Sequence, residues 1–273
     1  MIVYPHSKIN LGLHITQKRE DGFHDLETFF YPISLRDALE IIPAPDGKTE
    51  FFLSGEEIPG PSDKNLCIKA WQILQKTHAI PPVKIHLHKV IPTGAGLGGG
   101  SSDAAFTLKT LNELFDKKIS REKLKQYASE LGSDCSFFLK DSPAYATGRG
   151  EILTPYPLSL NGFYLLLVIP DIHISTAEAY AGISPAKPEI PLKEILAYPL
   201  EKWSINLKND FEKNIFNKYP EIKKIKTELY NMGAIYASMS GSGASVFGIF
   251  NQKPKDDDKK LFENHFLWEE ILR

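Results

Sequence analysis

The residues best suited to chemistry lie in one glycine-rich stretch, IPTGAGLGGGSSDAA, at 91–105. Five glycines lie between Gly94 and Gly100, and two serines and an aspartate follow at 101–103. Glycines allow successive backbone N–H groups to point at one spot, and the start of a helix adds unpaired N–H groups and a positive dipole end. These features favour a bound phosphate, and a serine hydroxyl there could bind a phosphate oxygen or Mg²⁺.

This stretch differs from three better-known phosphate-binding loops. Gly94, Gly96 and Gly99 fit the dinucleotide fingerprint, but that motif belongs to an early βαβ unit with an acidic residue about 20 positions further on. No Gly-Lys-Ser/Thr follows the glycines, as a Walker A motif requires. The loop also leads into a helix, whereas the glycine loop of protein kinases lies between two strands and precedes a Val-Ala-Ile-Lys strand.

Two charged residues elsewhere in the chain are candidates for catalysis. Asp134 lies in GSDCSFF, directly after a glycine that ends a helix, where a carboxylate could accept a proton. The sequence alone leaves open that Asp134 only caps its own turn. Lys8 lies at the start of a strand-like run, where a lysine usually extends its ammonium group to solvent. Asn10 is two residues further on and therefore on the same strand face as Lys8.

The elements that must position these groups follow from the spacing of apolar residues. We expect a helix capped by Ser62 or Asp63, a second directly after the glycine loop, a third capped by Ser120, and a fourth that starts at Pro220. Strands are expected at 8–15, 37–42, 49–53, 84–90 and 163–169, with a hairpin of 234–239 and 244–250 and a surface loop at 253–260. The absence of regular βα alternation favours an α+β fold.

Composition and charge narrow the class of protein. The chain has 273 residues, 42% hydrophobic and 24% charged, which is typical of a globular protein with room for two lobes. A net charge of -2 gives no electrostatic reason to expect nucleic acid or an anionic membrane as partner. The sequence shows no secretory signal and only two cysteines, so we expect a cytoplasmic protein with reduced thiols.

The glycine stretch resembles the second motif of the GHMP kinases, the superfamily of galactokinase, homoserine kinase, mevalonate kinase and phosphomevalonate kinase. PHSKINLGLHI at 5–15 is similar to the family's first motif, and SMSGSGASVFGIF at 238–250 to its third. The resemblance implies a kinase that uses ATP with Mg²⁺. It also implies a two-lobed α+β fold, with a ribosomal protein S5 domain 2-like N-terminal lobe at 1–154 and a ferredoxin-like C-terminal lobe at 155–273.

Three further segments resemble one branch of this family: KREDGFHDLETFF at 18–30, ELGSDCSFFL at 130–139 and ATGRGEIL at 146–153. That branch belongs to the non-mevalonate route to isoprenoid precursors. The resemblance implies phosphorylation of the 2-hydroxyl of a methylerythritol unit carried by cytidine diphosphate. It also implies that ATP and this substrate meet in a cleft between the lobes.

The resemblance assigns roles to residues at matching positions. Asp134 is the expected catalytic base and Lys8 its cationic partner, which also draws the hydroxyl and the transferring phosphate together. The expected ATP-binding residues are Asn65 and Lys89 near the base, and Pro92, Thr93, Gly94, Ala95, Gly96, Leu97, Gly98, Gly99, Gly100, Ser101 and Ser102 around the phosphates. The expected substrate-binding residues are Asn10, Phe23, His24, Phe30, Thr176, Tyr180, Gly241 and Ser242.

Some assignments stay open at this stage. Ser102 is offered as a Mg²⁺ ligand, but the glutamate that many relatives add cannot be identified, so phosphates and water could hold most of the ion. Another GHMP kinase, of the homoserine or mevalonate type, would share the loop and Asp134 without a cytosine clamp. A catalytically inactive nucleotide-binding relative and a nicotinamide-dependent oxidoreductase are more distant alternatives. We expect a monomer or a weak homodimer, with ATP and one small molecule as its partners.

Overall fold

The computed structural model describes residues 1–273, which form two compact units. Both units are built from segments that alternate along the chain. Unit 1 consists of Met1–Lys8, Ser34–Thr93 and Gly98–Ser142, and unit 2 of Ile9–Ile33, Gly94–Leu97 and Pro143–Arg273. Neither unit is one continuous stretch, and the expected division into 1–154 and 155–273 stays a prediction.

The sheet of unit 1 has four strands in the order β1-β4-β6-β5. These are β1 (Ile2–Val3), β4 (Ala38–Pro43), β6 (Val83–Lys89) and β5 (Glu50–Gly55). All neighbours are antiparallel except β5 and β6, which run parallel. Along β6 the side chains of Val83, Ile85 and Leu87 are fully buried and alternate with more exposed ones, as expected for a strand with one face on the core. The four expected strands that fall in or enter this part of the chain are confirmed.

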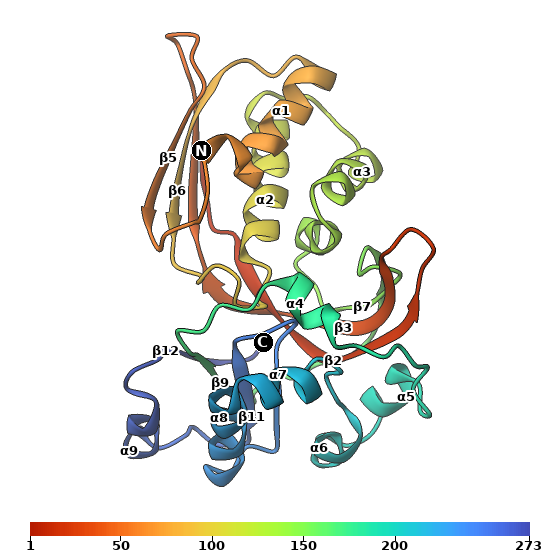
Figure 1. The fold of residues 1–273 in the computed structure, drawn as a ribbon. Coiled ribbons are helices and arrows are strands. Elements are labelled where there is room, and N and C mark those ends of the chain that lie inside the picture. The colour runs from red at the N-terminus through yellow and green to blue at the C-terminus, as the bar shows by residue number, and fades with distance from the viewer. The chain divides into compact units, whose positions relative to one another are not determined.

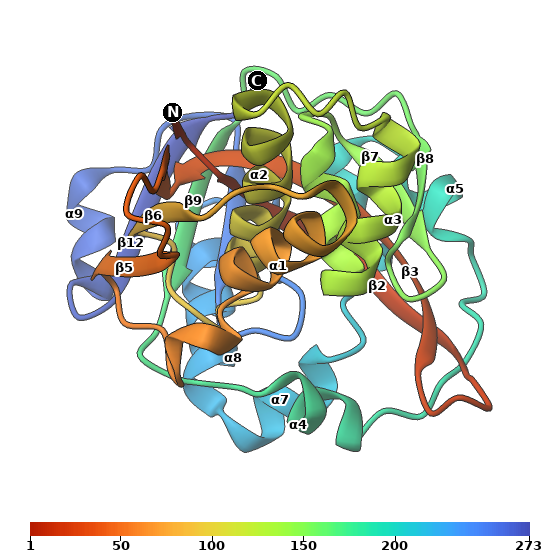
Figure 2. The same cartoon turned by 90° about the horizontal axis from the view of Figure 1, so that it is seen from above.

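Three helices pack together in unit 1: α1 (Leu66–His78), α2 (Gly99–Leu114) and α3 (Arg121–Leu131). Figures 1 and 2 show them next to one another on one side of β5 and β6. Helix α2 contacts α1, α3 and β4 and buries its small and apolar face, including Ala104, Ala105, Leu108 and Leu111. Two 3₁₀ helices complete the unit, η1 (Ser62–Lys64) and η2 (Ser133–Leu139).

The start of α1 corrects one expectation. Ser62 and Asp63 do not cap it, because they form η1, and Asn65 is the N-cap instead. The Asn65 side chain accepts a hydrogen bond from the Cys67 backbone N–H at 2.8 Å, which satisfies one of the unpaired donors of the first turn. At α3 the predicted cap is confirmed, since the Ser120 hydroxyl accepts from the Lys123 N–H.

Unit 2 contains most of two four-stranded sheets. The first has the order β2 (His6–Lys18), β3 (His24–Arg36), β7 (Ala144–Thr147) and β8 (Ile152–Pro155), and β2 and β3 both continue into unit 1. The second has the order β10 (Tyr236–Met239), β11 (Val246–Phe250), β9 (Tyr164–Ile169) and β12 (Phe266–Ile271), with every pair antiparallel. The expected hairpin of β10 and β11 and the expected strand near 163–169 are confirmed.

Helices cover the second sheet of unit 2. Ile222, Ile225 and Leu229 of α8 pack in one apolar cluster with Val168 of β9 and Val246 of β11. The helices of this unit are α4 (Thr176–Ala181), α5 (Leu192–Leu196), η3 (Leu200–Lys202), α6 (Trp203–Asn206), α7 (Glu212–Lys218), α8 (Pro220–Asn231), α9 (Asp256–Lys259) and η4 (Lys260–Phe262). The short helix α9 lies where a loop was expected at 253–260, and three aspartates in its first turn favour it by interacting with the helix dipole.

Neither cysteine forms a disulfide. Cys67 and Cys135 are both buried, and burial raises the pKa of each thiol. Thiols with raised pKa values are poor nucleophiles, so these two residues belong to the core. No helix combines the length and the apolar character that crossing a bilayer would need.

Candidate active site

The glycine stretch forms a turn that runs into the N-terminus of α2, as the sequence predicted. Gly98 is the N-cap of α2 and has a φ of 73°, a left-handed conformation that residues with a Cβ rarely adopt. Gly96, with a φ of 75°, lies so close to the backbone of Ser240 that a Cβ would come within 2.0 Å of the Ser240 oxygen. Both glycines are therefore required by the course of the chain.

Within unit 2, the turn after β10 braces the middle of this loop. The Ser240 hydroxyl donates to the Gly96 oxygen at 3.0 Å, and the Ser245 hydroxyl donates to the Ala95 oxygen at 2.6 Å. The Asn209 side chain in turn donates to the oxygen of Gly241 at 2.8 Å. The second and third sequence motifs are thus joined by hydrogen bonds, which fix the direction of the loop's main chain.

In unit 1, the first turn of α2 presents two serines. The Ser102 side chain is fully buried and its oxygen has no hydrogen-bond partner. A buried hydroxyl without a partner costs free energy unless something else binds it. The Ser101 hydroxyl lies near Cys135 of η2. No group of three or more histidine, cysteine, aspartate or glutamate side chains is arranged to hold a metal ion.

Lys8 and Asp134 form an ion pair in unit 1, with the Lys8 Nζ 3.6 Å from the Asp134 Oδ2. The Lys8 side chain is only 3% exposed, whereas that of Asp134 is 32% exposed. Burial lowers the pKa of Lys8, although the charge of Asp134 opposes this shift. The Lys8 chain also runs beside Gly98, where an added Cβ would lie 3.3 Å from the Lys8 Cε. The structure therefore brings together the two residues predicted to be catalytic, next to the end of the glycine loop.

The side chains of the two residues expected near the nucleotide base already bond to other groups of the protein. Asn65 caps α1, and the Lys89 ammonium is paired with Asp37 and, at 3.0 Å, with Asp103. All three side chains of this ionic cluster are at most 3% exposed. Burial raises the pKa of Asp103, with Lys89 opposing the shift and Asp37 adding to it. A nucleotide contact from Lys89 would have to come from its main chain, and the prediction stays untested.

Unit 2 holds the residues expected to bind substrate. The imidazole of His24 is stacked on the ring of Tyr180, with centroids 4.9 Å apart and planes inclined by 24°. The Arg149 guanidinium lies over the ring of Phe23, which is 53% exposed. Phe30 is different, because it is 2% exposed and belongs to the core. Its expected role as a stacking surface stays untested, and the burial makes it a weaker candidate than Tyr180.

The remaining expected substrate contacts lie at three places in unit 2. Asn10 is buried in β2 and donates to the Thr28 hydroxyl at 2.9 Å. Thr176 is the first residue of α4, and Gly241 and Ser242 lie in the turn that follows β10. Thr28 was not among the predicted site residues, although it lies within the segment 18–30 that carries the family resemblance. Alternation along β3 places Thr28 and Phe30 on one face of that strand.

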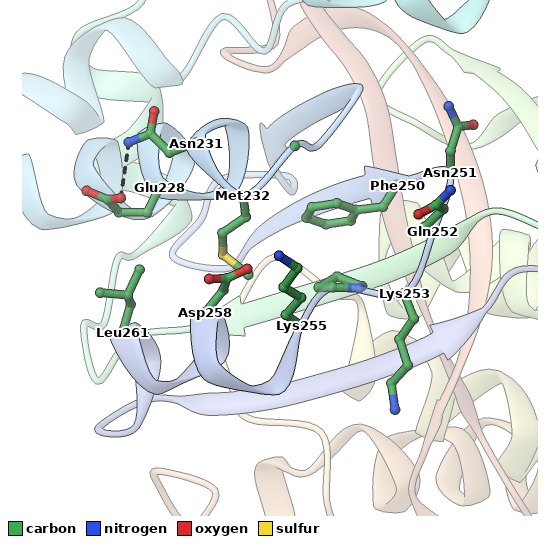
Figure 3. Close-up of a pocket in the computed structure, with 12 residues that line it drawn as sticks. Glu228, Asn231, Met232, Phe250, Asn251, Gln252, Lys253, Lys255, Asp258 and Leu261 are labelled. Atoms are coloured by element: carbon green, nitrogen blue, oxygen red, sulfur yellow. Dashed lines mark hydrogen bonds between the residues drawn. The ribbon is translucent and has the colours of Figure 1, made fainter.

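A separate hollow of about 560 Å³ lies in unit 2, between the end of α8, the end of β11 and α9. Figure 3 shows Asn231 bonded to Glu228 at its wall, with Lys255 and Asp258 across from them. Two lysines and two carboxylates line it, so charge selects neither an anion nor a cation. None of the predicted site residues lines this hollow.

Two family models match the chain. The GHMP kinases N terminal domain matches residues 65–142, and the GHMP kinases C terminal domain matches residues 194–265. The first match contains the glycine loop, Asp134 and α2, and the second contains the turn after β10.

Relatives and solved structures agree with these matches. A protein of Bacteroides fragilis named 4-diphosphocytidyl-2-C-methyl-D-erythritol kinase is 52% identical over 100% of both chains, and one of Parabacteroides distasonis with the same name is 49% identical over 98% of both. A crystal structure of 4-(cytidine 5'-diphospho)-2C-methyl-D-erythritol kinase superposes with a TM-score of 0.81 at 31% identity, covering 100% of this chain and 99% of the other. The mevalonate kinase of Methanococcus jannaschii shares the fold at a TM-score of 0.69 and 15% identity, with 100% and 98% of the two chains covered.

The resemblance inferred from the three motifs and the expected fold of mixed helices and sheets are thus confirmed. The identities above 40% over whole chains also separate this protein from the homoserine and mevalonate kinases, which share the fold alone. The chain belongs to the GHMP kinase family and, within it, to the 4-diphosphocytidyl-2-C-methyl-D-erythritol kinases.

Proposed function

We propose that this protein transfers the terminal phosphate of ATP to the 2-hydroxyl of 4-diphosphocytidyl-2-C-methyl-D-erythritol, a step of the non-mevalonate route to isoprenoid precursors. The names of the relatives support this assignment. The structural observation that carries the phosphoryl transfer is the ion pair of Lys8 and Asp134, because it places a base and a cation beside the end of the glycine loop.

Phosphoryl transfer requires positioning and charge neutralisation rather than covalent chemistry by the protein. In our proposal Asp134 accepts the proton of the attacking hydroxyl, and its partial exposure leaves it accessible to that group. Lys8 is buried beside it, and the two side chains form an ion pair that orients the Asp134 carboxylate. The same ammonium group stabilises the negative charge that builds up on the transferring phosphoryl group.

The polyphosphate of ATP would bind to the main chain of the loop and to the N-terminus of α2. The left-handed glycines leave their N–H groups without side chains in front of them, and the helix dipole favours the negative charge. The nucleotide contacts proposed for Asn65, Lys89 and the residues from Pro92 to Ser102 rest on this geometry and on the family resemblance.

The family implies Mg²⁺, and one observation fits that ion. The buried Ser102 oxygen has no partner in the protein, and a hard cation prefers such an oxygen ligand. Without a nearby cluster of carboxylates, phosphate oxygens and water would complete the shell. Bound there, Mg²⁺ would neutralise part of the charge of the polyphosphate.

For the other substrate, unit 2 offers aromatic rings and amides suited to an uncharged base. The stacked pair of His24 and Tyr180 presents both a flat ring and ring nitrogens that can bond to the edge of a cytosine. Asn10, Phe23, Phe30, Thr176, Gly241 and Ser242 are proposed as further contacts. A homoserine or mevalonate kinase would have no use for such a cytosine site.

A substrate panel tests the proposal. ADP release is measured with the diphosphocytidyl alcohol, mevalonate and homoserine, each with and without Mg²⁺, and ³¹P NMR identifies the new phosphomonoester. We expect turnover only with the cytidyl substrate and only with the metal. Equal rates with mevalonate or homoserine would overturn the assignment, and a complete lack of turnover with ATP binding retained would favour an inactive relative.

A further inference from the structure

A buried ionic cluster joins the two ends of the glycine loop within unit 1. At its centre, the Lys89 ammonium bonds to Asp37 and, at 3.0 Å, to Asp103. Lys89 is the last residue of β6, directly before the loop, and Asp103 lies in the first turns of α2, directly after it. Asp37 comes from a distant part of the chain, between β3 and β4.

Asp37 also binds the main chain at the entrance of the loop. Its Oδ1 accepts hydrogen bonds from the Val90 N–H at 2.6 Å and from the Ile91 N–H at 2.9 Å. Its Oδ2 accepts from Lys89. One carboxylate therefore fixes two successive backbone groups where the loop begins and, through Lys89, reaches the helix where the loop ends.

The helix end of the loop is shaped to hold Lys89. An added Cβ on Gly99, the first residue of α2, would lie 2.8 Å from the Lys89 Nζ and 3.0 Å from a side-chain carbon of Ile91. A larger residue at this point would push the ammonium group or Ile91 out of its present place. A cation next to a helix N-terminus is unfavourable by itself, and the two carboxylates of the cluster compensate for it.

We infer that Asp37 is a positioning residue for the proposed kinase reaction. Together with Lys89 it holds the entrance of the loop and the first turn of α2 in the arrangement that binds the polyphosphate of ATP. Asp37 is 1% exposed, so it acts through the loop and touches no substrate. The inference rests on the proposed function only in that ATP is the ligand of the loop.

Two substitutions of Asp37 test this role. Asp37→Ala removes both connections, whereas Asp37→Asn can accept from the loop N–H groups or from Lys89 but cannot serve both. We expect KM for ATP to rise at least about tenfold in Asp37→Ala, since losing a charged hydrogen bond corresponds to about tenfold or more. In Asp37→Asn we expect about fivefold, because the amide keeps part of these contacts as neutral hydrogen bonds. The value of kcat and the KM of the cytidyl substrate should stay within about threefold of wild type.

Glu27→Gln is the matched control. Glu27 is a part-buried carboxylate that, like Asp37, accepts from a backbone N–H, that of Leu192, and from a second side chain, Tyr145. It has no contact with the loop, so this variant should keep both KM values. If Asp37 only stabilised the fold, its substitution would lower the melting temperature, and KM for ATP would change no more than kcat or the KM of the cytidyl substrate. That result would overturn the inference.

Binding of a non-hydrolysable ATP analogue, measured by calorimetry without the second substrate, separates the two proposals. Weaker binding in both folded Asp37 variants supports the inference even if wild type fails to turn over the cytidyl substrate. Wild-type affinity in Asp37→Asn overturns it, and this variant decides the question if Asp37→Ala does not fold. If wild type binds no analogue, both the inference and the proposed function fail.

Discussion

The ring of Tyr180 lies 4.9 Å from the imidazole of His24, centroid to centroid, with the two planes inclined by only 24°. Tyr180 also meets the edge of Phe211, which belongs to the core of unit 2. Tyr180 is therefore held in place by a residue of the core. This arrangement is suited to hold a flat heterocycle with little loss of side-chain entropy on binding.

Tyr180→Leu should weaken binding of the cytidyl substrate. Stacking of a base on an aromatic ring contributes about 1–3 kcal/mol, so we expect KM for this substrate to rise about tenfold or more. KM for ATP should not change. Tyr198→Leu, which alters a tyrosine elsewhere in unit 2, is the control. A larger effect on KM for ATP than on that of the cytidyl substrate would place these rings in a nucleotide site.

Asp134→Asn should remove the base while keeping the shape of the side chain. We expect kcat to fall by at least about 10², the low end for loss of general-base catalysis, with analogue binding almost intact. Asp141→Asn changes another carboxylate of unit 1, which pairs with His6, and should leave kcat unchanged. Unchanged turnover in Asp134→Asn would show that another group accepts the proton.

The pH profile should report the charge of Lys8. Because burial lowers the pKa of Lys8, its cation is lost at a lower pH than that of a free lysine, and kcat/KM should fall on the alkaline side below pH 10.5. In Lys8→Arg the guanidinium stays charged, so any residual activity should lack this alkaline fall. Steady-state measurements of kcat/KM across pH 7 to about 10 would check both profiles.

The same shift has a consequence for stability. The folded chain binds fewer protons than the unfolded chain between the lowered pKa and 10.5, so the Lys8 contribution to the free energy of unfolding becomes more favourable as pH rises through that window. Lys8→Met lacks this dependence. Denaturant unfolding at several pH values gives the free energy of unfolding of wild type and of Lys8→Met. The difference between the two should shrink as pH rises, and a constant difference would contradict the expected shift.

Ser102→Ala should separate stability from activity. The Ser102 hydroxyl is buried without a partner, and such a group destabilises by about 1–3 kcal/mol, so its removal should not lower the melting temperature. If the hydroxyl binds Mg²⁺ or a phosphate, activity should fall and the Mg²⁺ concentration at half-maximal rate should rise. Thr110→Val removes another unpaired buried hydroxyl from α2 and should leave both kinetic properties unchanged.

Four helices and seven strands could be predicted from local sequence patterns, because capping residues, glycines and alternating apolar residues act over a few positions. Strands β3, β7, β8 and β12 and the short helices α4 to α7 were not predicted. The start of α1 could not be predicted, since Ser62, Asp63 and Asn65 are all good caps and only the intervening 3₁₀ turn decides among them. Short helix α9 escaped prediction because a charged run is equally common in loops.

The residues of the candidate site that lie in a recognisable motif could be predicted, whereas contacts between segments far apart in the sequence could not. Lys8 and Asp134 were selected by family resemblance, and the structure confirms only that they are paired. Asp37 gave no signal, because its partners at Lys89 and Asp103 are more than fifty residues away along the chain. Phe30 was expected to be accessible, but Phe29 and Phe30 are both buried, so β3 has cover on both faces there and alternation gives no information about exposure.

The alternation of segments between the two units constrains the order in which the protein can fold during its synthesis. Unit 1 has all of its residues once position 142 has left the ribosome. Unit 2 needs residues 9–33, yet strand β12, which pairs with β9, is made only after residue 265. Strands β2 and β3 can pair with each other early, but they must wait for the second sheet of unit 2, and this interval is where a nascent chain would depend most on chaperones.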